Sequence, residues 1–307
     1  MHVSTHRGLA DADPTAVAAL LDAARAADGR APLSERKGID LLEDGPDGLV
    51  TVLLTDGSSG EVAGLAQVSG HEGAWGIELV VHPDRREEVA AIERPLVEQA
   101  LDEVAGAGGG KVHLWVTDAA PEIDALAAEL GLRAGRELHQ LRRALPVDGD
   151  GDASDRGALP TRPFVPGRDE AAWLEVNNRA FASHPEQGGW TAATLAARVR
   201  EPWFDPEGFR LHERDGRLAG FCWTKVHRDQ DPPVGEIYVI GVDPAFRGHG
   251  IGRPLVLAGL DWLAGQGITQ AMLYADGDNR PALRMYADLG FTVDHVDRAY
   301  VTDVPPP

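Results

Sequence analysis

The sequence has 307 residues, and its 29 lysines and arginines against 49 aspartates and glutamates give a formal net charge of −20. A chain of this length is expected to form about two domains, and its acidic surface disfavours nucleic acid as a partner because phosphates are repelled. No apolar run reaches the roughly 20 residues of a membrane-spanning helix, the N-terminus lacks the apolar core of a signal peptide, and a single cysteine, Cys222, excludes an internal disulfide. We therefore expect a cytoplasmic protein without a membrane or nucleic-acid partner. We also expect a monomer, although none of these features determines the oligomeric state.

The first half is expected to alternate helices and strands. One helix begins where Asp13 caps the chain and Pro14 occupies the first turn, and Gly29 ends it. Apolar residues at helical spacing predict two more helices, at about 88–104 and 121–130. The predicted strands of this half are Leu49–Asp56, Glu61–Gly70, Gly76–Pro83, Lys111–Thr117 and His139–Leu145.

The second half repeats this order. Its predicted helices are Asp169–Ala182, Thr191–Arg200, Gly250–Ala264 and Asn279–Leu289, and its predicted strands are the hairpin Gly208–Arg228 with its Asp215-Gly216 turn, then Gly235–Pro244, Gln270–Asp276 and Phe291–Val301. The segment Glu78–Arg86 matches Val239–Arg247, and Pro121–Leu132 matches Pro281–Phe291. A shared period of about 160 residues is too long for a solenoid and indicates a duplicated domain.

A segment rich in proline, glycine and aspartate separates the two halves, from Pro146 to Gly167. It lacks apolar periodicity, as expected of a flexible linker. A calcium-binding loop is excluded because Ala153 stands at the position of the turn glycine and Leu159 at that of the bidentate glutamate. We therefore expect an N-terminal domain at 1–146, a linker at 147–160 and a C-terminal domain at 161–307.

A glycine-rich turn follows a predicted strand of the second half and leads directly into a helix. Gly248, Gly250 and Gly252 allow the backbone to turn sharply and to approach a ligand. Amide groups at the helix start, together with Arg247 and Arg253, form an anion site suited to a diphosphate. The spacing differs from the dinucleotide-binding Gly-x-Gly-x-x-Gly motif, and the Gly-Lys-Ser/Thr of a nucleotide P-loop is absent. By itself the segment is either such a site or a plain glycine turn.

The order of motifs around this turn resembles the acetyl-CoA signature of the GNAT family of N-acetyltransferases. Val-Asp-Pro at 242–244 precedes Arg-x-x-Gly-x-Gly at 247–252, and DNRPALRMYADLGF at 278–291 resembles the second half of the signature. The resemblance implies acetyl-CoA as co-substrate and no metal. It also implies an α/β (α+β) fold of two tandem GNAT-like domains, each with a mixed, mostly antiparallel central sheet flanked by helices.

The same resemblance implies which residues hold CoA. In this family the strand before the turn splays from its neighbour, and its free backbone binds the pantetheine arm; the matching positions are Ile240, Gly241 and Val242. The pyrophosphate loop would comprise Arg247, Gly248, His249, Gly250, Ile251, Gly252 and Arg253. The residues flanking the CoA arm would be Asn279, Arg280, Pro281, Ala282, Leu283 and Arg284.

Acetyl transfer from a thioester to an amine needs a base, an acid and a donor to the oxyanion. Glu236 precedes Gly241 on the same predicted strand and is the candidate base; otherwise it is a solvated strand residue. Tyr286 on the last helix is the candidate acid for the leaving thiolate; otherwise it only packs. A backbone N–H at Gly241 or Val242 would stabilise the oxyanion.

The first half lacks the residues that the second half offers for binding CoA and for catalysis. With Pro83 aligned to Pro244, Val89 stands at the position of Gly250, Ala127 stands at that of Tyr286, and Glu87 and Glu88 oppose a pyrophosphate. We expect this half to be degenerate and non-catalytic. The resemblance leaves open that it contacts CoA through Leu79, Val80 and Val81.

Over its whole length the chain is similar to the mycothiol synthase family of actinobacteria, most closely in GEIYVIGVDPAFRGHGIG at 235–252. Those enzymes acetylate the cysteine amino group of cysteinyl-glucosaminyl-inositol, a small-molecule substrate. The resemblance implies substrate contacts at Glu35, Glu186, Lys225, Glu236 and Tyr274. For Glu35 and Glu186 the alternative is a surface carboxylate. Cys222 is expected to be a buried core residue, and His249 a loop residue rather than a base.

Two other functions remain open at this point. One is a tandem acetyltransferase for another small amine or an aminoglycoside, which the acidic charge would suit. The other is a non-catalytic acyl-CoA-binding sensor, which the presence of both Glu236 and Tyr286 disfavours.

Overall fold

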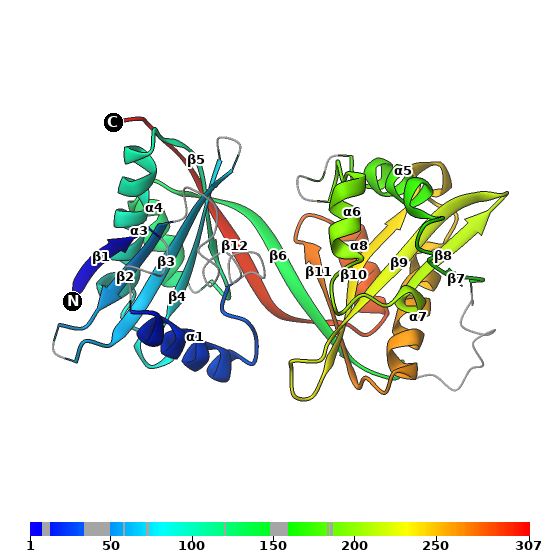
Figure 1. The fold of residues 1–307 in the computed structure, drawn as a ribbon, viewed down its shortest axis with the longest axis horizontal. Coiled ribbons are helices and arrows are strands. Elements are labelled where there is room, and N and C mark those ends of the chain that lie inside the picture. Colours follow the sequence, from blue (N-terminus) through cyan, green and yellow to red (C-terminus); the bar gives the residue numbers. More distant parts are fainter. Residues whose placement is uncertain are drawn as a thin grey trace. The chain divides into compact units, whose positions relative to one another are not determined.

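The computed structural model describes residues 1–7, 13–33, 50–57, 59–71, 74–119, 121–147, 159–182, 184 and 187–307. This part of the chain forms two compact units (Figure 1). Unit 1 comprises Met1–Leu138 and His295–Pro307, and unit 2 comprises His139–Asp294. Most of the predicted linker, residues 148–158, lies outside the described residues.

Unit 1 is built on a mixed sheet with flanking helices. Its elements are β1 (His2–His6), α1 (Pro14–Asp28), β2 (Val50–Thr55), β3 (Val62–His71), β4 (Ala74–Val81), the 3₁₀ turn η1 (Pro83–Arg85), α3 (Val89–Gly106), β5 (Gly110–Val116), α4 (Pro121–Glu129), the start of β6 (Arg133–Ala144) and most of β12 (Thr292–Val304). The strand order is β1-β2-β3-β4-β5-β12, and these neighbours are antiparallel except β4 and β5, which are parallel. The sequence analysis missed β1.

Unit 2 repeats this plan. Its elements are the rest of β6, β7 (Arg162–Pro163), α5 (Glu170–Ala180), α6 (Ala192–Arg198), the 3₁₀ turn η2 (Pro206–Gly208), β8 (Phe209–Arg214), β9 (Arg217–His227), β10 (Val234–Val242), the 3₁₀ turn η3 (Pro244–Phe246), α7 (Gly252–Gly265), β11 (Gln270–Asp276) and α8 (Arg280–Asp288). The strand order is β6-β11-β10-β9-β8-β7, with β10 and β11 parallel. Both units thus have the predicted mixed, mostly antiparallel sheet. No helix in the described ranges is long and apolar enough to cross a membrane.

Local signals explain where the predicted helices begin and end. The Asp13 carboxylate accepts hydrogen bonds from the amides of Thr15 and Ala16 at 3.0 and 3.2 Å, which caps α1. Gly29 ends this helix at φ 63°, in the left-handed region that glycine adopts without strain. The predicted start at Asp13-Pro14 and the predicted end at Gly29 are therefore confirmed.

The terminal strand of each half lies in the other unit. From His139 onward, β6 belongs to unit 2, and the Leu145 amide donates to the Thr269 carbonyl at 2.8 Å. From His295 onward, β12 belongs to unit 1 and pairs antiparallel with β5, with Tyr300 opposite Leu114. The compact units therefore differ from the predicted domains 1–146 and 161–307 at these ends. Periodicity identifies a strand but not the sheet that it joins.

Apolar clusters hold the sheet of unit 2 between its helices. On one face the rings of Phe209 and Trp223 stack at 4.3 Å between centroids, and Trp173 of α5 meets Trp223 edge-on at 5.8 Å. Cys222 points to the other face because successive strand residues alternate. There α7 lies so close that a Cβ on Gly259 would come within 2.6 Å of Cys222 Sγ. Glycine at this position lets α7 pack directly on the sheet.

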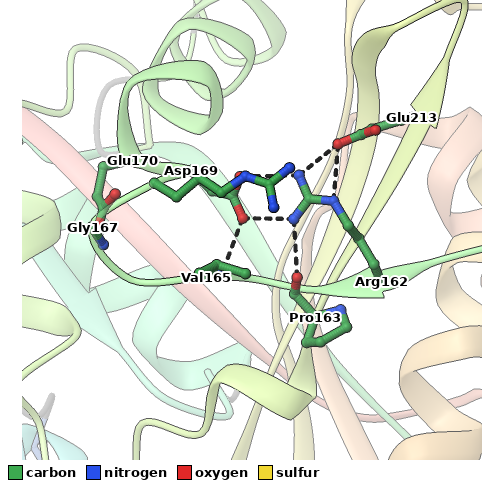
Figure 2. A network of polar contacts seen from close by, with 8 residues as sticks. Arg162, Pro163, Val165, Gly167, Asp169, Glu170 and Glu213 are labelled. Carbon is green, nitrogen blue, oxygen red and sulfur yellow. Dashed lines mark hydrogen bonds and ion pairs between the residues drawn. The ribbon is translucent and has the colours of Figure 1, made fainter.

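Arg162 on the short strand β7 forms an ion pair with Asp169, the N-cap residue of helix α5 (Figure 2). Its guanidinium donates to both carboxylate oxygens of Asp169 at 2.6 and 3.0 Å, and to Glu213 on β8 at 2.9 Å. Asp169 also accepts the Val165 amide at 2.8 Å. The last part of the segment predicted as linker-like, Arg162–Gly167, thus belongs to the folded unit 2. An ion pair between two side chains leaves no periodic signal in the sequence, so the sequence analysis missed this anchor.

One acidic residue interrupts the buried face of α3 in unit 1. Glu93 is 9 % exposed, and within the described part of the chain its Oε2 has no hydrogen-bond partner. Burial raises the pKa of this carboxyl group to about 7. Its neighbours Ile92 and Leu96 are fully buried. Glu93 is therefore held in an environment that favours its uncharged form.

Replacement of Glu93 by glutamine should flatten the pH dependence of stability. Between the ordinary value near 4.5 and the folded value of about 7, the folded chain holds a proton that the unfolded chain has lost. The free energy of unfolding therefore falls as pH rises through this window. Glu93→Gln removes this loss, about 1–3 kcal/mol between pH 5 and pH 8. Urea unfolding at both pH values measures it, with Glu98→Gln on the exposed side of α3 as the control. Equal pH dependence in wild type and Glu93→Gln would contradict the assignment.

Candidate active site

Glu236 lies on the central strand β10 of unit 2, flanked by a polar neighbour on one side. Its Cα pairs with Lys225 on β9 and with Met272 on β11. Glu236 is 8 % exposed and Lys225 is 9 % exposed. A buried carboxylate and a buried amine on adjacent strands are costly unless they have partners or a function. Glu236 is therefore not the solvated strand residue that the sequence had left as its alternative.

The partner of Glu236 is a histidine that the sequence analysis did not single out. His227 Nε2 lies 2.7 Å from Glu236 Oε2. Lys225 Nζ lies 4.8 Å from the centre of the Trp203 ring and 5.9 Å from that of Tyr238, which is a cation–π arrangement. His227 lies at the end of β9, two residues after Lys225. This position points to Glu236 only when the pairing of β9 with β10 is known, so the sequence alone did not identify His227.

A break in the sheet follows Glu236. Strand β10 pairs with β11 over Gly235–Ile237 and continues to Val242, pairing with β9 on its other side. The register with β9 shifts between Ile237 and Val239, which marks a β-bulge at Tyr238. Beyond Ile237 the backbone on the β11 side is thus free of that parallel ladder and can bind an extended ligand. This is the splay that the family resemblance implied for Ile240–Val242.

Gly241 lies at this break and has little room around it. A Cβ there would come within 2.8 Å of the Phe221 ring and 3.3 Å of the Phe181 ring. Glycine at this position therefore lets the strand pass directly beneath two aromatic rings.

The glycine-rich turn has the geometry of an anion site. Gly248 and Gly250 have φ angles of 79° and 73°, and a Cβ on either would meet nothing within 4 Å. Conformation rather than space thus requires glycine here. Helix α7 then begins at Gly252, and no side chain caps its first amides. Open amides at a helix start attract negative charge, so the residues present fit a diphosphate.

Two arginines border the turn. Arg247 donates to the Ala180 carbonyl at the end of α5 at 3.0 Å, and Arg253 reaches the Asp288 carbonyl at 3.5 Å. Because a carbonyl carries no net charge, each guanidinium keeps its positive charge available to a phosphate. His249 Nδ1 contacts the Arg247 carbonyl at 3.1 Å, in keeping with its expected place in the loop.

Tyr286 lies on α8 in the apolar cluster beneath β10. It is 5 % exposed, meets Phe291 edge-on at 5.8 Å, and shares this cluster with Ile240. Burial raises the pKa of its hydroxyl group above the usual value. The hydroxyl therefore stays protonated at neutral pH, as a proton donor must. The remaining predicted CoA contacts form the start of α8, where the Asn279 side chain accepts the Ala282 amide at 3.4 Å.

The other predicted residues divide into three groups. Tyr274 on β11 is 40 % exposed, and its hydroxyl accepts a hydrogen bond from Gln140 Nε2 at 2.6 Å. Cys222 is fully buried, and burial raises the pKa of its thiol to about 12, so it is a core residue as expected. Glu35 and Glu186 lie outside the described residues.

The corresponding region of unit 1 differs in charge. Strand β4 leaves β5 after Glu78, so the backbone of Leu79–Val81 is also free of its parallel neighbour. Arg86, however, is bound by both carboxylate oxygens of Asp28 at 2.7 and 2.8 Å. Arg85 pairs with Glu88. The arginines near this turn are thus neutralised by the chain itself.

Helix α3 also begins differently from α7. Unit 1 has two more residues after Pro83 than unit 2 has after Pro244; beyond them Glu93-Arg94-Pro95-Leu96-Val97 repeats Gly252-Arg253-Pro254-Leu255-Val256, so Glu93 matches the first residue of α7. Helix α3 already begins at Val89, one turn earlier than this match would place it. Unit 1 thus has a helical turn where unit 2 has its open glycine turn.

A valine at Gly250 should weaken the binding of acetyl-CoA, the ligand that the motif predicts. A β-branched residue at a φ of 73° strains the turn by about 1–2 kcal/mol, which corresponds to a roughly tenfold higher Kd. Isothermal titration calorimetry measures it. The control is Gly265→Val at the end of α7, where a Cβ also meets nothing within 4 Å. Equal Kd values for the two variants would contradict the assignment of the turn.

Comparison with known proteins agrees with this geometry. The profile of the acetyltransferase (GNAT) family matches residues 172–291. The chain is 45 % identical to the mycothiol acetyltransferase of Acidimicrobium ferrooxidans over 94 % of both chains. It is 46 % identical to that of Thermomonospora curvata over 98 % of this chain and 96 % of the relative.

Solved structures share the fold of the whole chain. A GCN5-related N-acetyltransferase from Sphaerobacter thermophilus has a TM-score of 0.72 at 23 % identity and covers 99 % of this chain and 96 % of its own. A tandem GNAT protein from the clavulanic acid biosynthesis pathway has a TM-score of 0.69 at 21 % identity over the full length of both chains. The predicted tandem GNAT fold is therefore confirmed. The chain is an N-acetyltransferase and belongs to the mycothiol acetyltransferase family.

Proposed function

We propose that the chain transfers the acetyl group of acetyl-CoA to the cysteine amino group of cysteinyl-glucosaminyl-inositol, the last step of mycothiol synthesis. The mycothiol acetyltransferases of Acidimicrobium ferrooxidans and Thermomonospora curvata, 45 % and 46 % identical over almost the whole chain, support this substrate. The observation that carries the reaction is the arrangement within unit 2. There an uncapped helix start, a strand that leaves its neighbour, a buried glutamate and a buried tyrosine belong to one sheet and the helices packed on it.

Acetyl-CoA supplies an acetyl group activated as a thioester. The amides at Gly248–Arg253 and the guanidinium groups of Arg247 and Arg253 would hold its diphosphate. The free backbone of Ile240–Val242 would take its pantetheine arm by strand-like hydrogen bonds. The start of α8, at Asn279–Arg284, would lie along the same arm.

Glu236 would accept the proton of the substrate amine, directly or through water. An α-amino group has an ordinary pKa near 7.7, so a substantial fraction is already neutral at physiological pH. A carboxylate is therefore a strong enough base for this step. The low exposure of Glu236 favours this role because few water molecules compete with the amine for its oxygens.

Tyr286 would donate its proton to the sulfur that leaves. A hydroxyl group whose pKa is raised by burial remains protonated until the thiolate develops. A backbone N–H at Gly241 or Val242 would stabilise the negative charge on the carbonyl oxygen. Lys225 and Tyr274 are proposed to contact the hydroxyl groups of the pseudodisaccharide, and Gln140 already orients the Tyr274 hydroxyl. Glu35 and Glu186 stay predictions from the family resemblance.

Mass spectrometry of the product tests the substrate. Purified protein, acetyl-CoA and cysteinyl-glucosaminyl-inositol should give a product heavier by one acetyl group, attached to nitrogen. Glucosaminyl-inositol, which lacks the cysteine, should stay unmodified and serves as the matched control. Acetylation of glucosaminyl-inositol, or of an unrelated aminoglycoside in preference to the cysteinyl compound, would contradict the proposed substrate.

Substitution of the proposed acid and base tests the mechanism. Tyr286→Phe and Glu236→Gln should each lower kcat by about 10²-fold or more, because each removes a group that moves a proton. The Kd for acetyl-CoA should stay within about twofold of wild type. The control is Tyr300→Phe on β12 of unit 1. It also removes the hydroxyl group of a buried tyrosine, but one with no proposed part in the reaction, so kcat should stay unchanged. A Tyr286→Phe variant with the wild-type kcat would exclude Tyr286 as the acid.

A further inference from the structure

His227 holds one oxygen of the Glu236 carboxylate. His227 is the last residue of β9, and its Nε2 lies 2.7 Å from Glu236 Oε2. The strand register explains the contact. Lys225 is directly opposite Glu236, and His227 lies two residues further along β9, on the same face. Diagonal neighbours of this kind are within reach of each other when both side chains are long.

The two oxygens of Glu236 have different surroundings. Among the described residues, His227 is the hydrogen-bond donor to Oε2, and none donates to Oε1. The carboxylate is 10 % exposed, and the His227 side chain is 18 % exposed. The imidazole therefore covers one side of the carboxylate and itself reaches solvent. The remaining hydrogen-bonding capacity of the carboxylate lies at Oε1.

A glutamate acting as a base must lie within hydrogen-bond distance of the proton that it accepts. A free glutamate side chain samples many rotamers, and fixing it at each encounter costs conformational entropy. A hydrogen bond to one carboxylate oxygen removes most of this freedom before the substrate binds. A donated N–H also stabilises the negative charge that a base must carry.

We infer that His227 is a positioning residue that donates its Nε2–H to Glu236 Oε2 and so presents Oε1 to the acceptor amine. The amine proton passes to Oε1, directly or through one water, and the His227 hydrogen bond stays in place. No bond to His227 forms or breaks. This inference rests on the proposed function because it requires Glu236 to be the base.

Two amide substitutions at His227 separate this role from simple packing. In glutamine the amide nitrogen lies near the position of Nε2, whereas in asparagine it lies near that of Nδ1. Both replacements are polar and uncharged, but only His227→Gln keeps a donor within reach of Glu236. His227→Asn should lower kcat about tenfold and leave the KM for acetyl-CoA unchanged, because the charge-assisted hydrogen bond is lost. His227→Gln should stay within about threefold of wild type.

A double-substitution cycle distinguishes the positioning role of His227 from a purely structural one. In the Glu236→Gln background, His227→Asn should cause no further loss of kcat, because the group that it positions is gone. His113→Asn on β5 of unit 1 is the control for a strand histidine outside the site and should leave kcat unchanged. A wild-type melting temperature for each variant shows that it is folded. Labelling of histidine with ¹⁵N in the wild type should show a proton on Nε2 of His227 and needs no variant.

Each outcome decides the matter. Equal kcat for His227→Gln and His227→Asn, whether both retain or both lose activity, overturns the positioning role. An effect on the KM for acetyl-CoA alone, or a further loss in the Glu236→Gln background, also overturns it. A Glu236→Gln variant with full activity removes the base itself. That result defeats the proposed mechanism, whereas loss in Glu236→Gln with no loss in His227→Asn defeats this inference alone.

Discussion

The parallel hydrogen-bond ladder between β10 and β11 stops at Ile237, although β10 continues to Val242. This interruption leaves backbone donors and acceptors at the centre of a sheet without a strand on one side, which a folded protein tolerates only where another partner is supplied. The bulge at Tyr238 turns the strand, and Gly241 lets it pass beneath Phe221. The free backbone of Ile240–Val242, the start of α7 and the place of Tyr286 all follow from where β10 leaves its neighbour.

The two units show how one fold can keep or lose such a site. Both have a strand that parts from its parallel neighbour, after Ile237 in unit 2 and after Glu78 in unit 1. They differ in the turn that follows. Unit 2 has glycines at positive φ and arginines that contact backbone carbonyls, so positive charge remains. In unit 1, Asp28 neutralises Arg86, and the buried Glu93 matches Gly252. The difference is electrostatic more than architectural.

The sequence predicted those parts that depend on local chemistry. The cap at Asp13, the end of α1 at Gly29 and the glycine turn at 248–252 each rest on neighbouring residues, and the structure has all three. What it could not predict depends on contacts between residues of different strands. The exchange of β6 and β12 between units, the Arg162–Glu213 contact and the His227–Glu236 hydrogen bond all require knowledge of which strands pair. For the same reason the place of Glu236 before Gly241 on one strand predicts the base, whereas nothing local predicts the histidine that holds it.

Acetyl-CoA is proposed to bind at the break in the sheet of unit 2. Hydrogen–deuterium exchange with and without acetyl-CoA tests this binding mode most directly, because it reports on backbone amides in both units at once. Protection should appear in peptides covering Ile240–Arg253 and Asn279–Arg284. Unchanged exchange in these peptides at a saturating concentration, or protection confined to Leu79–Glu88 in unit 1, would contradict the account.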